Sequence, residues 1–217
     1  MVAIKDREVI RKYIREGIID KIIYKDIPQL FKIEDASVLE ALINLLMDEP
    51  GQLLELSDLA SELKITRQTL SNYIIYLEES QLLRKLYNYS RNRRKTERKH
   101  KKYYPAVISV DLSFSSDSIM KSQAFEWLIV NQTGAEFFWR DAYKNEVDMV
   151  LGKKMPIPIE VKYGKISIDG LCAFMRKFKT TKGTIVSYDR EDEIKVKEGT
   201  IRIVPAYDLL LEPKKSD

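Results

Sequence analysis

Cysteine and histidine are almost absent from this chain of 217 residues, which contains one of each, Cys172 and His100. Disulfide frameworks, zinc sites built from these two residue types and iron–sulfur clusters therefore lack their ligands. A serine or cysteine nucleophile would need His100 as its base, but that residue lies in a cationic run where protonation and solvent exposure are expected. Histidine-dependent catalysis is therefore not expected, whereas a hard metal bound by carboxylates stays open.

Long apolar segments and phosphate-binding glycine motifs are also missing. The longest apolar runs, such as FEWLIV, are far shorter than the roughly 20 residues that cross a bilayer. The N-terminus, MVAIKDREVI, carries charges where a signal peptide has its apolar segment. No GxGxxG occurs, and no glycine lies five residues before Gly152 or Gly164, so we expect no P-loop. We predict a cytoplasmic protein without a membrane partner.

Glycine and proline are scarce as well, with eight and seven residues. Together with 44% hydrophobic and 32% charged residues, this predicts a folded protein with long regular elements. The length corresponds to one or two domains, since a soluble domain usually takes about 100–200 residues.

Positive charge is concentrated in residues 90–102, SRNRRKTERKHKK. This run holds eight Lys or Arg and one acid, a local charge of +7, so the rest of the chain carries −3 of the net +4. Such a block attracts phosphates. The alternative is a solvated, self-repelling loop.

Helical patterns fill the first 80 residues. Residues 4–33 are expected to form short helices. Ser37 and Glu40 form a capping-box pattern that predicts the start of the next helix, and Ser57 and Thr66 are expected to cap two more. The third of these would bury its apolar stripe and expose, near its N-terminal end, the residues that a recognition helix presents to base edges: Arg67, Gln68, Ser71 and Asn72.

Strand-like segments at 82–89 and 103–110 flank the basic run, and the combination predicts a winged helix-turn-helix at residues 34–112. Its wing tip would contact backbone phosphates through eight cations: Arg91, Arg93, Arg94, Lys95, Arg98, Lys99, Lys101 and Lys102. The alternative is a winged helix used for protein contacts.

From residue 113 the pattern changes to alternating helices and strands. The predicted order is α-β-β-β-α-β-β, with elements at 118–132, 136–140, 146–151, 157–163, 168–179, 183–188 and 201–205. This gives an α/β (α+β) fold with a mixed sheet flanked by helices.

Acidic residues and a lysine recur on these strands. Strand alternation puts Glu160 and Lys162 on one face, and Glu146 and Asp148 on one face of the preceding strand, opposite Val147, Met149 and Leu151. If the two strands form an antiparallel hairpin, Asp148 can approach Glu160. Clustered carboxylates repel each other unless a divalent cation such as Mg²⁺ or Mn²⁺ takes their oxygens.

Glu126 lies in the helical segment AFEWLIV, with apolar neighbours on both sides. A buried, unpaired carboxylate there would cost several kcal/mol or become protonated, so a metal or its waters would supply a partner. The alternatives are a salt bridge on the helix surface for Glu126 and an ordinary exposed pair for Glu160 and Lys162.

The ordered passages AFEWLIVNQ, FFWR, NEVDMVL and PIEVKYG are similar to the pattern of PD-(D/E)XK nucleases, including archaeal Holliday-junction resolvases. Preceded by YSRNRRKTERKHKKYYP, the layout resembles the C-terminal half of prokaryotic, including archaeal, AAA-type ATPases. In that half, a winged helix precedes a restriction-endonuclease-like domain. The resemblance covers most of the chain, but the P-loop domain of those ATPases is missing. The chain is therefore expected to be a natural or recombinant fragment, or a stand-alone relative.

The resemblance implies roles for single residues. Asp148 and Glu160 match the metal-binding acids, Glu126 the helix acid that assists them, and Lys162 the lysine that orients or polarises water. Arg140 could hold a phosphate or form a structural salt bridge.

Three parts are therefore predicted: a helical lead-in at 1–33, a winged helix at 34–112 and a PD-(D/E)XK nuclease-like domain at 113–217. The expected function is Mg²⁺- or Mn²⁺-dependent hydrolysis of DNA phosphodiester bonds, with DNA, an ATPase domain and a second copy of the chain as partners. The alternative is a non-catalytic DNA-binding or partner-docking module of an AAA-type ATPase.

Overall fold

The computed structural model describes residues 6–92, 94, 96, 100–152 and 155–211, which form two compact units. Unit 1 draws on residues 1–85 and 103–120, and unit 2 on residues 86–102 and 121–217. The division differs from the predicted ranges because residues 86–102, which belong to the predicted winged helix, fall in the same unit as residues 121–217.

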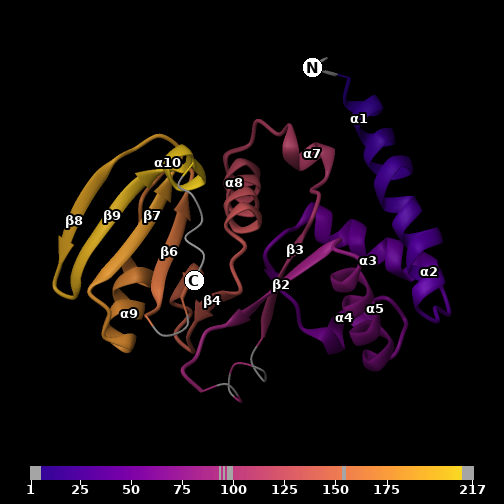
Figure 1. Cartoon of the computed structure of the whole chain (residues 1–217), viewed down its shortest axis with the longest axis horizontal. Helices are drawn as coiled ribbons and strands as arrows, with labels where there is room; N and C mark the ends of the chain where they lie inside the picture. The colour runs from indigo at the N-terminus through magenta and orange to yellow at the C-terminus, as the bar shows by residue number, and fades with distance from the viewer. Residues whose placement is uncertain (1–5, 93, 95, 97–99, 153–154, 212–217) are drawn as a thin grey trace. The chain divides into compact units, whose positions relative to one another are not determined.

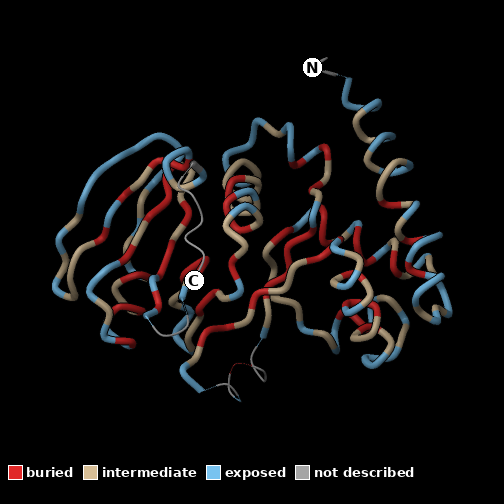
Figure 2. Tube along the Cα trace, viewed as in Figure 1, coloured by how far each residue is buried: buried red, intermediate tan, exposed pale blue. Residues whose placement is uncertain are grey.

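Unit 1 begins with a helical segment, as predicted: α1 (Arg7–Ile14), two π-helical turns η1 (Arg15–Ile19) and η2 (Ile22–Asp26), and α2 (Ile27–Leu30). Helix α1 buries no residue, and Figure 2 shows it largely exposed. The later part of the segment joins the unit's core through Ile19, Ile23 and Ile27.

The remaining described helices of unit 1 follow this segment (Figure 1). They are α3 (Ala36–Asp48), α4 (Leu56–Glu62), α5 (Arg67–Glu79) and α7 (Val110–Ser113), with the short strand β1 (Gln52–Leu53) between α3 and α4. Helices α3, α4 and α5 form because they share a core, to which each contributes leucine or isoleucine at helical spacing. The fully buried side chains at its centre are Leu39, Leu42, Leu46, Leu70 and Leu77.

Two of the three cap predictions were wrong. The N-cap of α3 is Asp35, whose Oδ1 accepts a hydrogen bond from the Ser37 backbone N–H at 2.8 Å, so Ser37 lies inside the helix. Helix α4 begins after Glu55 without a side-chain cap, and Ser57 is its second residue. The third prediction is confirmed, since Thr66 caps α5 by accepting from the Thr69 N–H at 3.0 Å.

Strands β2 (Leu83–Asn88) and β3 (Lys101–Pro105) run through both units. The first matches its predicted range closely. The second begins two residues before the predicted range, 103–110, and ends at Pro105; residues 106–109 connect it to α7, which Ser109 caps.

Unit 2 contains α8 (Ser118–Thr133), most of which belongs to this unit, and α9 (Asp169–Phe178) and α10 (Ala206–Leu211). Its strands are β4 (Phe137–Arg140), β5 (Glu146–Leu151), β6 (Ile157–Lys162), β7 (Lys182–Ser187), β8 (Asp192–Val196) and β9 (Gly199–Pro205). The predicted elements from 118 to 205 are confirmed within a few residues, whereas β8 and α10 were not predicted.

The described strands form a mixed sheet in the order β1-β3-β2-β4-β5-β6-β7-β9-β8. Within unit 2, β4, β5 and β6 form an antiparallel meander, and β6, β7 and β9 are parallel (Figure 1). Helix α9 covers one face through a cluster that includes Phe174, Phe178, Trp139, Ile185 and Ile203. In the described part of the chain, none of the helices has the length and apolar character that a bilayer crossing requires.

Candidate functional site

A one-residue irregularity in β5 sets the position of Asp148. Phe137 of β4 pairs with Val150 and Trp139 with Val147, so three steps along β5 correspond to two along β4. The extra residue forms a β-bulge, a feature that re-aims side chains and is frequent beside active sites. Val147 and Val150 consequently share the cluster under α9, and the predicted common face of Val147, Met149 and Leu151 was wrong.

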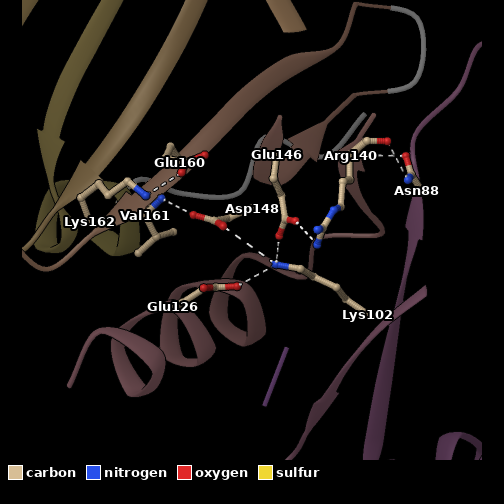
Figure 3. Close-up of polar contacts among 9 residues, drawn as sticks. All are labelled: Asn88, Lys102, Glu126, Arg140, Glu146, Asp148, Glu160, Val161 and Lys162. Atoms are coloured by element: carbon tan, nitrogen blue, oxygen red, sulfur yellow. Dashed lines mark hydrogen bonds and ion pairs between the residues drawn. The ribbon is translucent and has the colours of Figure 1, made fainter. Parts of the chain in front are cut away.

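The carboxylate of Asp148 is buried and uses both oxygens (Figure 3). Oδ2 accepts a hydrogen bond from the backbone N–H of Val161 on β6 at 2.8 Å. Oδ1 lies 4.0 Å from Nζ of Lys102. The side chain therefore lies between the end of the β5–β6 pairing and the Lys102 ammonium.

Lys102 of β3 is the centre of an ion-pair cluster. Its Nζ lies 2.6 Å from Oε1 of Glu146 and 3.3 Å from Oε1 of Glu126 on α8. It also lies 5.7 Å from the ring centre of Phe138. The side chain is only 7% exposed, and Figure 3 shows one ammonium facing three carboxylates. Charges buried in this way require paired groups.

Arg140 supports the same cluster from the end of β4. Its Nη1 lies 3.1 Å from Oε2 of Glu146, and its backbone exchanges two hydrogen bonds with the Asn88 side chain, at 3.0 and 3.3 Å. Gly170 of α9 fixes the Glu146 backbone from another side, since a Cβ there would lie 1.9 Å from the Glu146 carbonyl oxygen. Of the two alternatives for Arg140, the structure shows the salt bridge.

Glu160 and Lys162 form a second pair, with Nζ 2.6 Å from Oε1. The other carboxylate oxygen, Oε2 of Glu160, is buried and has no hydrogen-bond partner among the described residues. Glu160 is paired with Ile185 on the parallel strand β7, so it projects on the α9 side of the sheet.

Glu126 approaches from the other side. Thr133 of α8 donates a hydrogen bond to Sδ of Met149, so Met149 faces α8. Met149 is paired with Ile159 on β6, so Ile159 faces α8 as well. Glu160, the next residue of β6, therefore projects on the opposite side of the sheet from α8. Figure 3 accordingly shows Asp148 between Glu126 and the Glu160–Lys162 pair.

The pKa values of two of the acids, Asp148 and Glu160, are raised, chiefly by burial. Burial raises the pKa of Asp148 well above its ordinary value, and the charges of Glu126 and Glu160 raise it further. Burial also raises the pKa of Glu160, against the opposing effect of Lys162. For Lys162, burial works to lower the pKa, but Glu160, Asp148 and Glu126 outweigh it, so its pKa is raised. Lys162 is therefore a fixed positive charge at neutral pH.

The predicted site residues are thus neighbours without forming one metal cage. Glu160 and Lys162 form one pair, and Glu126 contacts Lys102 instead of the other acids. Asp148 lies beside the Glu160–Lys162 pair and beside Lys102. In the residues that the structure describes, no three Asp, Glu, His or Cys side chains lie close enough together to hold one ion. The sequence interpretation assigned Lys102 to the wing and gave Glu146 no role, and their positions depend on pairing between distant strands.

The predicted wing is described only in part. Arg93, Lys95, Arg98 and Lys99 lie outside the described residues. Arg94 is exposed, while Arg91 donates to the Phe178 carbonyl oxygen at 2.6 Å and Lys101 lies 5.6 Å from the Tyr87 ring centre. Lys102 does not lie at an exposed tip, because the carboxylates of unit 2 bury it.

The predicted recognition residues lie at the start of α5. Arg67 and Gln68 are exposed, and Ser71 and Asn72 are half-buried. Gln68 donates to Oδ1 of Asn72 at 3.1 Å, and Ser71 donates to the Arg67 carbonyl oxygen at 2.9 Å. These contacts leave the Arg67 guanidinium on the surface of unit 1.

Comparison with known proteins divides the chain in two. Residues 2–106 match a family described as Domain of unknown function (DUF8612), and residues 120–209 match Domain of unknown function (DUF4143). Domains of the second family occur in C-terminal regions associated with AAA-type ATPases.

The chain is also similar to Uncharacterized protein MJ1637 of the archaeon Methanocaldococcus jannaschii. The identity is 29% over 209 residues, covering 89% of this chain and 43% of the relative. The chain thus spans less than half the length of that relative. No solved structure matches.

Proposed function

We propose that unit 2 is a PD-(D/E)XK-type domain that hydrolyses DNA phosphodiester bonds with a divalent cation. The observation that carries the proposal is the pair of acids on neighbouring strands, the buried Asp148 and the half-buried Glu160, with Glu160 beside the ammonium of Lys162. The observed succession α8-β4-β5-β6-α9-β7 supports it, because the family resemblance rests on this order of helices and strands.

Asp148 and Glu160 are the residues that would hold Mg²⁺ or Mn²⁺. The buried Oε2 of Glu160, which lacks a hydrogen-bond partner among the described residues, and the raised pKa values of both acids fit a site that requires more positive charge. Two carboxylates are sufficient, since Mg²⁺ commonly binds one or two and takes its other ligands from water and phosphate. When bound, such an ion supplies an activated water and stabilises charge on the phosphoryl group.

The chain's own residues then have distinct tasks. Lys162 stays protonated, so it would stabilise developing negative charge and would not accept a proton. The Val161 N–H fixes one oxygen of Asp148. Glu126 adds negative charge near the site from α8, as its effect on the pKa of Asp148 indicates.

We further propose that residues 34–112 bind DNA as a winged helix. Helices α3, α4 and α5 followed by β2 and β3 have the order of that fold, and the exposed Arg67 and Gln68 at the start of α5 would meet base edges. The basic run 90–102, apart from the buried Lys102, would contact backbone phosphates. Action together with an AAA-type ATPase, in the cytoplasm and as a homodimer, is part of the same proposal.

A second function is favoured by one observation, the position of Lys102. The Lys102 ammonium forms ion pairs with Glu126, Glu146 and Asp148. A non-catalytic DNA-binding or ATPase-docking module would use such an internal cation, in place of a metal, to neutralise these acids.

Cleavage of plasmid, linear and branched DNA in Mg²⁺ or Mn²⁺ tests the first function. We expect divalent-dependent cleavage that is lost in Asp148→Asn and Glu160→Gln. Glu198→Gln is the control, since this acid of the same unit pairs with Arg176 at 2.8 Å, and it should retain activity. No cleavage by the unaltered chain rejects a nuclease in favour of the second function. Cleavage that survives Asp148→Asn rejects the assignment of Asp148 to a nuclease site.

DNA affinity measured against salt concentration tests the binding role. Arg67→Ala should weaken binding, and neutralising the exposed cations of 90–102 should reduce the slope of log affinity against log salt. Unchanged affinity after charge reversal of this run would show that it is not the DNA contact.

A further inference from the structure

Lys102 is a buried charged residue of this region that the proposed reaction does not use. We propose that Lys102 is an internal counter-ion that competes with the divalent cation for Asp148, so that it sets the metal affinity of the site. This inference rests on the proposed metal-dependent function and assigns Lys102 a positioning role within it.

The Lys102 ammonium lies among carboxylates that could otherwise bind a metal cation. It lies 2.6, 3.3 and 4.0 Å from oxygens of Glu146, Glu126 and Asp148, so three carboxylates from two different elements, β5 and α8, converge on it (Figure 3). The longest of these contacts is to Asp148, the acid assigned to the metal. Asp148 is therefore the partner that Lys102 would share most readily with a second cation.

Lys102 is also held in place. The side chain is 7% exposed, extends from β3 and lies over the Phe138 ring. Its shortest partner, Glu146, is in turn fixed by Arg140 at 3.1 Å and by the close approach of Gly170 to its backbone. A buried ammonium fixed in this way cannot move into solvent without losing its ion pairs with the buried Asp148 and the half-buried Glu126 and Glu146.

The charges drawn in Figure 3 show the consequence. Among the residues labelled in Figure 3, four acids, Glu126, Glu146, Asp148 and Glu160, lie near three cations, Lys102, Arg140 and Lys162. With all seven ionised, this set carries one excess negative charge. A divalent ion would turn this balance positive, whereas a site without the Lys102 charge would be neutralised by that ion. The proximity of like charges disfavours binding in a buried site.

With the divalent ion bound, this set of residues would carry one excess positive charge, which a DNA phosphate would neutralise. The unaltered protein should therefore bind the divalent ion weakly alone and more tightly when a phosphodiester is present. In this way Lys102 would couple metal binding to substrate binding.

Titration of the full chain with Mn²⁺, followed by calorimetry and by the thermal stability shift, tests the inference without any activity assay. Lys102→Gln removes the charge and keeps N–H donors for the carboxylates. We expect it to bind Mn²⁺ about 10- to 100-fold more tightly, the size of effect that residues behind metal ligands commonly have. Adding non-cleavable DNA should tighten Mn²⁺ binding in the unaltered chain and have little effect in Lys102→Gln.

Lys85→Gln is the matched control. Lys85 of unit 1 is also partly buried and forms a 2.6 Å ion pair, with Glu78, so its loss removes a comparable pair. Its Mn²⁺ affinity should equal that of the unaltered chain. Lys102→Met provides a second test, since it also removes the charge. Mn²⁺ should raise the Tm of this variant more than it raises the Tm of the unaltered chain.

The outcomes separate the inference from the proposed function. Mn²⁺ binding by the unaltered chain with no tightening in Lys102→Gln overturns the role of Lys102 and leaves the metal site intact. Absence of Mn²⁺ binding in all variants overturns both. If neither Lys102 variant folds with or without Mn²⁺, Lys102 is a structural ion-pair residue and the inference is wrong.

Discussion

Asp148 and Val161 are joined across β5 and β6 by a hydrogen bond in which the Val161 backbone N–H donates to Oδ2 at 2.8 Å. The bond lies directly beyond the last regular pairs of the two strands, which begin at Met149 and Ile159. A carboxylate thus takes the place of a backbone carbonyl as the acceptor for a strand N–H. This substitution holds an acid inside the sheet where the proposed chemistry requires one.

Asp148→Asn should stabilise the protein at alkaline pH. Burial and the neighbouring acids raise the pKa of Asp148, so the folded protein binds this proton more tightly than the unfolded chain. Its contribution to stability is therefore complete below the unfolded pKa and is lost as pH rises through the folded pKa. Thermal unfolding at several pH values should show the variant gaining on the unaltered chain as pH rises.

Asp141→Asn is the opposite control for this measurement. Burial acts to raise the pKa of Asp141, but hydrogen bonds from Asn145 and Tyr143 outweigh it, and the pKa is lowered. Its stabilising effect is therefore present above the unfolded pKa, and the variant should lose stability at neutral pH. A Tm difference for Asp148→Asn that does not change with pH would contradict the assigned ionisation.

Lys162→Met should reduce DNA cleavage without weakening DNA binding. Loss of one fixed charge that stabilises a transition state typically lowers kcat by about 10²- to 10³-fold. Lys162→Arg keeps the charge and should retain part of the activity. Single-turnover cleavage rates, measured beside DNA affinity, separate the two effects, and equal rates for the Met and Arg variants would exclude an electrostatic role.

Gly170→Ala should destabilise the protein by about 1–3 kcal/mol, as expected when a packed interior receives an extra methyl group. The new Cβ would lie 1.9 Å from the Glu146 carbonyl oxygen, so α9 or β5 must shift. Gly164→Ala meets no atom within 4 Å and should change stability by less than about 1 kcal/mol. Denaturant unfolding of both variants measures this difference, and similar values would contradict the close approach.

Thr66→Ala should cost about 1 kcal/mol, because its side chain accepts the hydrogen bond from the Thr69 N–H at the start of α5. Ser57→Ala should stay within about 0.5 kcal/mol, since Ser57 is inside α4 and does not cap it. Urea unfolding provides both values. An equal loss in the two variants would mean that the Thr66 cap is not a separate stabilising contact.

Local patterns predicted most of unit 2. Alternation of apolar and charged residues identified β5 and β6, and apolar spacing identified α9, whose stripe is buried. The burial of β5 does not follow this alternation, because four consecutive residues of the strand are buried. Strand β8 was missed because its sequence, DEIKV, is charged and mostly exposed and gives little apolar signal. The start of α3 was misplaced because Asp35 captures the N–H of Ser37, and both residues are good caps.

The candidate site was predictable only in part. Glu160 and Lys162 are two residues apart on one strand, so alternation alone brings them together. The contact of Lys102 with Glu126 and Glu146 depends on the pairing of distant strands, which local patterns do not encode. In the sequence, Lys102 is one of eight cations in a run, and nothing local distinguishes the one that becomes buried.

The bulge in β5 means that deletion of one residue there should preserve the sheet but change the position of the acid. Removal of one residue between Val147 and Val150 would give β4 and β5 equal spacing, which a sheet accommodates as ordinary pairing. The same deletion would turn the carboxylate away from β6. Homologous chains with a regular strand here should therefore keep the architecture while lacking an acid at this point.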